Sequence, residues 1–286
     1  STQSRSSAAS DVYKRQRVHA ILDVLAKPGT CLSLRVPARH RMSLDDWVMA
    51  SSMTAETAHL LEQVVVRKLA FLVTGGTGSG KTTLLASLLG CVPAHERIVI
   101  VEDSRELSPD HEHVVSLEAR AANAEGRGQV SLTDLVRQSL RMRPDRVVLG
   151  EVRGAELRDM LMALNTGHEG GCGTVHANGV QEVPARLEAL AALSGMNRPA
   201  AHAQVAAAFH LVLHLVRGPK GRRLAQIGVF EHVDGCAVVT QALVFDEDLV
   251  CTPGPGAERL GDLVGEQTVS RVVQGQGRPR RARRAA

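Results

Sequence analysis

The chain alternates between short aliphatic runs and segments whose apolar residues recur at helical spacing. The runs are rich in β-branched residues, as in strands buried on both faces of a parallel sheet, and they lie at 69–73, 97–103 and 146–150. Helical spacing is clearest after residue 155, where apolar side chains recur at i, i+3, i+4 and i+7, namely Leu157, Met160, Leu161 and Leu164. Strands that alternate with helices predict an α/β fold with a parallel sheet.

The first 40 residues show a weaker pattern. Residues 1–16 are rich in Ser and Ala without periodicity, and we interpret them as a non-native or disordered leader. Two short strands are predicted on either side of the turn signal Lys27-Pro28-Gly29, at 17–25 and 31–35. Residues 17–40 are therefore interpreted as the remnant of a small, partial α+β N-terminal domain.

A helical segment is predicted to follow this remnant. Ser43 to Asp46 matches a capping box, and a second helix begins at Thr54, so residues 41–68 are interpreted as a helical linker. Further on, helices and strands are predicted at 182–194, 200–209, 211–216, 224–230 and 237–245. These elements complete one domain over 69–250. Gly, Pro and Arg dominate after that point, which predicts a disordered basic tail over 251–286.

Composition narrows the possible functions. The formal net charge is +4, but the leader contributes +2 and the arginine-rich run 278–284 contributes +5, so the body carries about −3 and offers no general surface for a polyanion. The 5 cysteines are widely spaced, without a C-x-x-C pair or a metal-ligand grouping. Reduced thiols, the lack of a secretory signal and the lack of a membrane-length apolar run predict a cytoplasmic protein without direct membrane insertion.

The strongest chemical signal follows the first aliphatic run. Residues 75–83 fit G-x-x-x-x-G-K-[ST], the P-loop or Walker A motif, between a predicted strand and a predicted helix. Glycines let successive backbone N–H groups point at phosphate oxygens, Lys81 would reach the β- and γ-phosphates, and Thr82 would offer its hydroxyl to Mg²⁺. The predicted nucleotide-binding residues are Gly75, Gly76, Thr77, Gly78, Ser79, Gly80, Lys81, Thr82 and Thr83.

Two further strands end in carboxylates. In open α/β sheets ligands lie beyond the carboxyl ends of the strands, so Glu102 and Glu151 are expected to face the P-loop. We predict Glu102 as general base or water-orienting carboxylate, because its strand is expected to emerge next to the P-loop strand, and Glu151 as the Walker-B-type acid that contacts Mg²⁺ through water. A carboxylate at the end of a parallel strand can also lack a catalytic role and simply contact solvent or a helix N-terminus.

Four motifs, in the same order, resemble those of the secretion traffic ATPases. In addition to the P-loop, Glu102-Asp103-Ser104-Arg105-Glu106-Leu107 resembles their Asp box, and Leu140 to Asp145 with Gly150-Glu151-Val152-Arg153-Gly154 resembles their Walker B region. Thr166 to Gly170 with Gly173-Thr174-Val175-His176-Ala177-Asn178 resembles their His box. The resemblance covers about residues 17 to 245. Met142 and the 173–178 sequence are most similar to the tight-adherence (Flp) pilus assembly branch, TadA/CpaF-like.

This resemblance implies a RecA-like ATPase domain that uses ATP and Mg²⁺, a homo-hexameric ring, and an inner-membrane platform protein of a pilus or secretion system as partner. It implies that Arg17 and Arg35 reach the γ-phosphate from the N-terminal domain, and that His176 senses the γ-phosphate or couples subunits. The chain departs from the family in its short N-terminal domain. It also lacks the zinc-binding cysteine quartet of the type II pilus-extension branch.

Two other functions remain open from the sequence. A RecA-like nucleic-acid motor would use the arginine-rich tail, although no aromatic residues interleave it for base stacking. A nucleotide-binding scaffold without turnover would need neither Glu102 nor Glu151. The transported or assembled substrate has no sequence signature.

Overall fold

The computed structural model describes residues 9–11, 16–27, 29–35, 41–123 and 125–275. The chain divides into two compact units, residues 1–41 and 42–286, and each is described by itself. In the first unit, strands β1 (Ala9–Asp11), β2 (Gln16–Ile21) and β3 (Cys31–Arg35) form an antiparallel sheet in the order β1-β2-β3. The strand expected to reach residue 25 ends at Ile21, because the backbone turns there with Leu25 N–H donating to Leu22 O at 2.9 Å.

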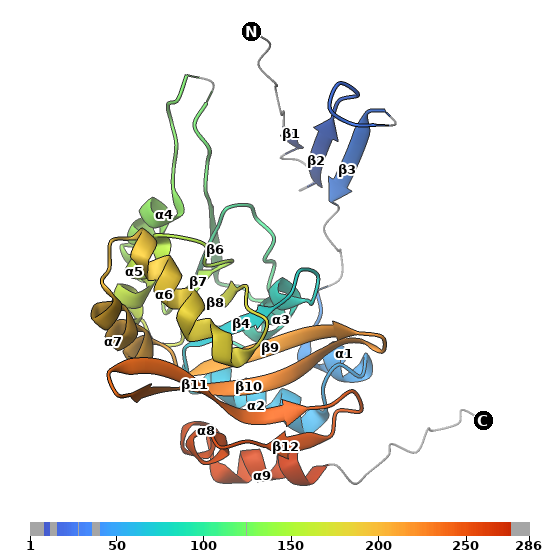
Figure 1. Ribbon diagram of the computed structural model, residues 1–286, viewed down its shortest axis with the longest axis vertical. Coiled ribbons are helices and arrows are strands. Elements are labelled where there is room, and N and C mark those ends of the chain that lie inside the picture. Colours follow the sequence, from blue (N-terminus) through green and yellow to red (C-terminus); the bar gives the residue numbers. More distant parts are fainter. Residues whose placement is uncertain (1–8, 12–15, 28, 36–40, 124, 276–286) are drawn as a thin grey trace, which may run out of the picture. The chain divides into compact units, whose positions relative to one another are not determined.

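The second unit is built on one nine-stranded sheet (Figure 1). Its order is β12-β11-β10-β9-β4-β8-β7-β5-β6, and the pairs from β9 through β6 are parallel, whereas those from β9 to β12 are antiparallel. The strands are β4 (Phe71–Gly75), β5 (Ile98–Glu102), β6 (Val114–Glu118), β7 (Arg146–Leu149), β8 (Cys172–Val175), β9 (Leu211–Gly218), β10 (Gly221–Val233), β11 (Cys236–Phe245) and β12 (Cys251–Pro253). The predicted α/β class is confirmed.

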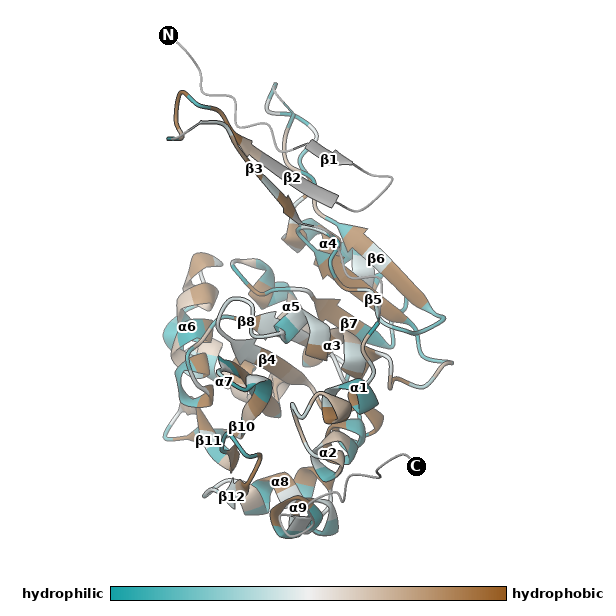
Figure 2. Ribbon diagram, turned by 90° about the vertical axis from the view of Figure 1, so that its right-hand side faces the viewer, coloured by the Kyte–Doolittle hydropathy of each residue, from teal (hydrophilic) through white to brown (hydrophobic). Residues whose placement is uncertain are grey.

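Helices cover both faces of this sheet. They are α1 (Leu44–Met49), α2 (Ala55–Val66), α3 (Lys81–Leu89), α4 (Leu132–Leu140), α5 (Glu156–Leu164), η1 (Val180–Glu182), α6 (Val183–Leu193), α7 (Arg198–Ala208), α8 (Ala257–Val264) and α9 (Glu266–Gln274). Phe71 and Val73 pack into a core with α1, α2, α3, α8 and α9, whereas Leu72 packs into a second core with α4 to α7. Side chains on a strand alternate between faces, so β4 is buried on both. Figure 2 shows the hydrophobic colour of the neighbouring strands β5 and β7.

Residues 42–68, predicted as most of a helical linker over 41–68, pack instead into the core of the larger unit. Trp47 on α1 is 1% exposed, and its Nε1–H donates to Ser87 Oγ on α3 at 3.0 Å. Leu60 and Leu61 on α2 are fully buried. The predicted capping box is present, with the Ser43 side chain accepting from Asp46 N–H. Apolar periodicity identified these helices, but it does not tell which surface covers their apolar faces.

The prediction of a disordered segment from residue 251 was wrong for residues 251–275. Strand β12 adds to the sheet beside β11, and helices α8 and α9 lie along β11 and β12 (Figure 1). Four apolar side chains of these helices are buried in the same core as α2, namely Leu260, Val264, Val269 and Val272. Burial of these side chains stabilises the folded segment more than its Gly and Pro residues destabilise it. Residues 276–286 of the predicted tail lie outside the described residues.

Two more elements were absent from the sequence-based prediction. Strand β6 pairs with β5 from Val114 to Glu118, and the chain then extends into an arm closed by the bridge between Arg120 and Val130.

None of the helices in the described part of the chain is long and apolar enough to cross a membrane.

Candidate nucleotide-binding and catalytic site

The P-loop lies between β4 and α3, as predicted. Strand β4 ends at Gly75, whose φ is +145° and where a Cβ would lie 2.3 Å from Leu215 O on β9, so a larger residue has no room. Helix α3 begins at Lys81 after Gly80, whose φ of +102° is left-handed. Thr82 and Thr83 occupy the first turn of α3, at the helix N-terminus where a phosphate is stabilised by free N–H groups.

Lys81 folds back over the loop. Its Nζ donates to Gly75 O at 2.9 Å and to Gly76 O at 3.0 Å. Burial lowers the pKa of Lys81, and the charge of Glu151 opposes this effect in part. The ammonium group therefore lies at the mouth of the loop, close enough to Glu151 for the two charges to influence each other.

Glu151 and His176 meet at the carboxyl ends of adjacent strands. Strands β7 and β8 pair in parallel with Leu149 opposite Gly173, so the residues that follow emerge side by side. His176 Nε2 lies 3.0 Å from Glu151 Oε1. Burial and the charge of Lys81 lower the pKa of His176, so the imidazole is mostly neutral near pH 7 and its contact with Glu151 is a close polar one.

Arg153 connects this pair to the end of β5. Its Nη2 donates to Glu151 Oε2 and its Nη1 donates to Asp103 Oδ2 at 3.2 Å. Burial alone would raise the pKa of Glu151, but the hydrogen bond and charge of Arg153, with His176 and Lys81, outweigh it and lower that pKa. Glu151 is thus a carboxylate held ionised by its neighbours.

Glu102 is a different kind of carboxylate. Its side chain is 5% exposed; Oε1 accepts the N–H groups of Glu106 at 3.1 Å and Leu107 at 3.0 Å, whereas Oε2 is buried without a hydrogen bond among the described residues. Burial raises the pKa of Glu102 to about 7, although the two backbone donors oppose it. A carboxyl group with a pKa near neutrality can accept and release a proton under cellular conditions.

The position of Glu102 in the sheet differs from the prediction. Its strand β5 was expected next to the P-loop strand, but β8 and β7 lie between β4 and β5. Glu151 is also separated from the P-loop strand, by β8. Sequence order does not fix strand order in a parallel sheet, because each crossover helix can place the next strand several positions away.

The predicted arginines Arg17 and Arg35 lie in the first unit. They are paired directly across the antiparallel strands β2 and β3. Their proposed reach to the γ-phosphate stays a prediction, because the two units are described separately.

Sequence reasoning missed the roles of Asp103 and Arg153 as contact residues. Both belong to motifs that were recognised, but their ion pair depends on β5 and β7 being neighbours.

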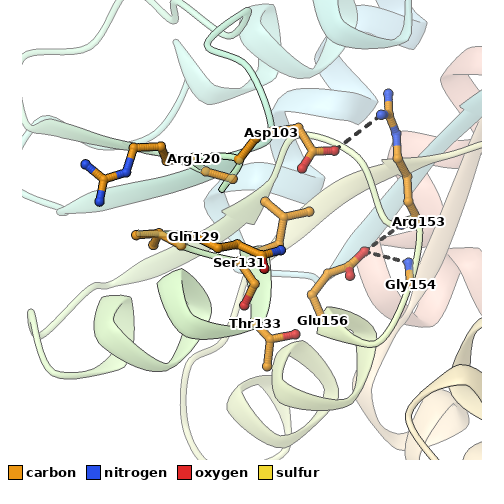
Figure 3. Close-up of a pocket in the computed structure, with 12 residues that line it drawn as sticks. Asp103, Arg120, Gln129, Ser131, Thr133, Arg153, Gly154 and Glu156 are labelled. Carbon is orange, nitrogen blue, oxygen red and sulfur yellow. Dashed lines mark hydrogen bonds and ion pairs between the residues drawn. The ribbon is translucent and has the colours of Figure 1, made fainter. Parts of the chain in front are cut away.

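Asp103 and Arg153 also line a cavity of about 440 Å³, between the arm after β6 and the N-terminal ends of α4 and α5 (Figure 3). In the same cavity Glu156 Oε1 accepts the N–H groups of Arg153 at 2.6 Å and Gly154 at 2.7 Å. No P-loop residue lines this cavity, so it adjoins the phosphate site without forming it.

Comparison with known proteins identifies similar chains. The model of the family described as type II/IV secretion system protein matches residues 16–247. A Mycobacterium tuberculosis protein named for conjugal transfer is 56% identical over 220 residues, which are 77% of this chain and 62% of the relative. The conjugal transfer protein TrbB of Rhizobium radiobacter is 32% identical over 211 residues, which are 72% of this chain and 61% of the relative. The chain thus spans about three fifths of the length of these relatives.

A solved structure has the same fold. The VirB11 ATPase of the Brucella suis type IV secretion system superposes with a TM-score of 0.53 at 25% sequence identity, over 74% of this chain and 70% of that chain. The α/β architecture expected from the P-loop and the strand pattern is therefore that of secretion ATPases.

Proposed function

The chain belongs to the type II/IV secretion system protein family, and on that premise we propose that it is an ATP-hydrolysing motor of a pilus or secretion system. The observation that carries the proposal is the convergence of Lys81, Glu151 and His176 beside the P-loop. A cation, a carboxylate held ionised and a neutral imidazole meet there at the carboxyl edge of a parallel sheet. Phosphoryl transfer requires charge neutralisation, metal positioning and an oriented water molecule.

The loop and Lys81 would bind the phosphates. N–H groups at the start of α3 favour an anion, and Lys81 would exchange its hydrogen bonds to the Gly75 and Gly76 carbonyls for phosphate oxygens. The fixed loop geometry means that these donors need little reorganisation when the transition state forms.

Thr82 and Glu151 would hold Mg²⁺, Glu151 through water. The fit rests on the lowered pKa of Glu151, which keeps the carboxylate charged, and on the place of Thr82 in the first turn of α3. When bound with ATP, Mg²⁺ neutralises charge that develops on the phosphates. Arg153 would orient Glu151 by donating to Oε2, and His176 Nε2 lies 3.0 Å from Oε1.

Glu102 would act as general base toward the attacking water. Its pKa of about 7 lies near neutral pH, where the ionised form is well populated and can accept a proton. Its Oε1 is held by two backbone donors, so the buried Oε2 is the atom that we assign to the proton.

Other parts of the proposal concern assembly. We propose that six chains form a ring, that Arg17 and Arg35 approach the γ-phosphate from the N-terminal unit, and that His176 senses the γ-phosphate or couples sites. An always-charged, planar guanidinium suits that role. The motor would act in the cytoplasm, peripheral to the inner membrane through a platform protein.

Two roles for the motor deserve comparison. The variants at Met142 and in the 173–178 sequence support assembly of a Flp-type pilus. The names of the relatives favour conjugal transfer or another type IV secretion process. Both roles use the same hydrolytic site.

Glu151→Gln tests the proposal, because it preserves shape and removes the charge. Phosphate release with Mg²⁺ and ATP should fall by about two orders of magnitude or more, the usual cost of losing an essential electrostatic group. Glu118→Gln is the matched control, since Glu118 also ends a parallel strand but is exposed on the edge strand β6. Phosphate release unchanged by Glu151→Gln would contradict the assignment of Glu151, and nucleotide binding without phosphate release by either chain would favour a scaffold without turnover.

A further inference from the structure

Two arginines face each other on the β9–β10 hairpin, on the side of the P-loop strand away from Glu151. Arg217 on β9 is the register partner of Arg222 on β10. Strand β9 pairs in parallel with β4, with Leu215 opposite Gly75, so the hairpin turn extends beside the P-loop. Both arginines are exposed.

Both side chains reach the loop. Arg222 Nε donates to Gly78 O at 3.0 Å, and its Cδ lies 3.2 Å from the position that a Cβ on Gly80 would take. Arg217 Nη1 lies 3.8 Å from the corresponding Cβ position of Gly78. Gly80 also has Trp47 Cη2 at 3.1 Å from its Cβ position, so the loop is held between an indole ring and a guanidinium group.

The hydrogen bond from Arg222 fixes the direction of one peptide group. In a trans peptide, the C=O and the following N–H point to opposite sides. With Gly78 O turned toward Arg222, the N–H of Ser79 points away from the hairpin, and it donates to Gly76 O within the loop at 3.3 Å. Arg222 thus turns an N–H donor toward the interior of the loop, where a phosphate would lie.

The charges of the pair are uncompensated within the described residues. No carboxylate in that part of the chain lies within ion-pair distance of Arg217 or Arg222, whereas Lys220 in the same turn pairs with Asp248 at 2.5 Å. Like charges directly opposite on antiparallel strands destabilise the pairing. An anion beside the pair would relieve this repulsion.

We propose that Arg222 is a positioning residue of the P-loop, and that Arg217 and Arg222 together attract the polyphosphate of the nucleotide bound there. This inference deepens the proposed function and rests on it. The hairpin forms a wall of the nucleotide site that the P-loop, Asp box, Walker B and His box motifs do not include. The terminal nitrogens of Arg222 make no hydrogen bond to other described residues, so they are available to an anion.

The test is nucleotide affinity, measured by titration calorimetry with Mg-ADP and with the non-hydrolysable analogue AMP-PNP. Arg222→Gln should raise the dissociation constant about 10-fold, the usual effect of losing a hydrogen bond to a charged group. Arg222→Lys should restore part of this loss. Arg217→Gln should raise the constant about 3-fold, and the effect should shrink at high salt, because it acts through charge alone. Lys220→Gln removes the same charge from the same turn and should leave the affinity unchanged.

The outcomes separate this inference from the proposed function. If Lys81→Ala lowers phosphate release but Arg222→Gln binds nucleotide normally, the inference is wrong and the proposed function stands. If Lys81→Ala releases phosphate as fast as the unmodified chain, the proposed function itself fails. A weaker affinity of Arg222→Gln that comes with a lower melting temperature of the nucleotide-free protein would show a merely structural role and overturn the inference. A change in the oligomeric state of the arginine variants with unchanged nucleotide affinity would also overturn the inference, because it would indicate that the pair binds a carboxylate of a second copy of the chain.

Discussion

Glu102 lies directly against the backbone of Gly150. A Cβ on Gly150 would come within 2.5 Å of Glu102 Cγ and 3.0 Å of Glu102 Oε1. Gly150 follows β7 and Glu102 ends β5, so the close approach joins the ends of two neighbouring strands. The absence of a side chain at position 150 therefore determines where the Glu102 carboxyl group lies.

Gly150→Ala should displace Glu102 and slow hydrolysis. We expect kcat for ATP to fall at least about 10-fold, because a displacement of about 1 Å can have a large effect on a positioned catalytic group. The KM for ATP should change little, since the P-loop contacts remain. Steady-state kinetics measures both values. Gly179→Ala is the control, because a Cβ there meets only Gln226 Oε1 at an ordinary 3.7 Å. Equal kcat values for the two variants would contradict the role of the contact.

Glu102→Gln should lower activity and raise stability. The pKa of Glu102 is about 7 in the folded protein, against an ordinary value of 4.5. Between these values the folded state binds more protons than the unfolded state, so the free energy of unfolding falls as the pH rises, and the loss persists above pH 7. Gln cannot ionise. The variant should therefore unfold at a higher temperature than the unmodified chain at pH 8 and at the same temperature at pH 4.5.

Phosphate release by Glu102→Gln should fall by about two orders of magnitude, as expected for loss of a general base. In the unmodified chain kcat/KM should fall as the pH drops below about 7, because Glu102 becomes protonated. A Glu102→Gln variant that is less stable at pH 8, or fully active, would contradict this account.

The sequence predicts the strand, loop and helix of the P-loop well because their geometry is local. A strand, three glycines with positive φ, Lys81 and a helix start lie within about ten consecutive residues, and local backbone rules determine how they fold. The surroundings of Glu102 were less predictable. Its neighbour Gly150 becomes a contact only once β5 and β7 pair, and the sequence does not encode that order in any local signal.

Arg146→Met should destabilise the larger unit strongly. Arg146 is 1% exposed; its Nε donates to Glu96 Oε2 at 2.7 Å and its Nη2 donates to Val65 O at the end of α2 at 2.8 Å. Without the arginine, the Glu96 carboxylate stays buried, and its Oε1 lies 3.5 Å from Lys68 Nζ. The free energy of unfolding should fall by about 3–5 kcal/mol, measured by denaturant titration.

The double variant Arg146→Met with Glu96→Leu provides the control for this pair. It removes both buried charges, so it should recover part of the lost stability. A double variant less stable than Arg146→Met would contradict the view that the unpaired Glu96 charge causes the loss.

Leu260→Ala tests whether the segment after residue 251 is part of the fold. Leu260 on α8 is fully buried in the core that also contains α2 and α3. Its truncation should lower the free energy of unfolding by about 2–5 kcal/mol, the usual cost of removing a buried leucine. Gln267→Ala, on the exposed face of α9, should leave the thermal midpoint unchanged. Equal midpoints for the two variants would support a disordered segment.

This segment also shows where composition misled the sequence analysis. Thr252 to Gly256 is rich in Pro and Gly, and the arginine-rich run follows residue 277, so the whole end was assigned to one tail. Between them, Leu260, Val264, Val269 and Val272 provide the apolar faces of two short helices. Their spacing was a usable signal, but each helix is only 8 or 9 residues long and is held mainly by tertiary packing.

The most direct test of the account is Mg²⁺-dependent ATP hydrolysis measured over a range of protein concentrations, for the unmodified chain and Lys81→Ala. Phosphate release is expected to rise more than proportionally with protein concentration, because the proposed function has Arg17 and Arg35 complete sites in an assembled ring. Lys81→Ala should lower the rate by about two orders of magnitude or more at every concentration. Phosphate release unchanged by Lys81→Ala would contradict the central claim that this P-loop is the site of hydrolysis.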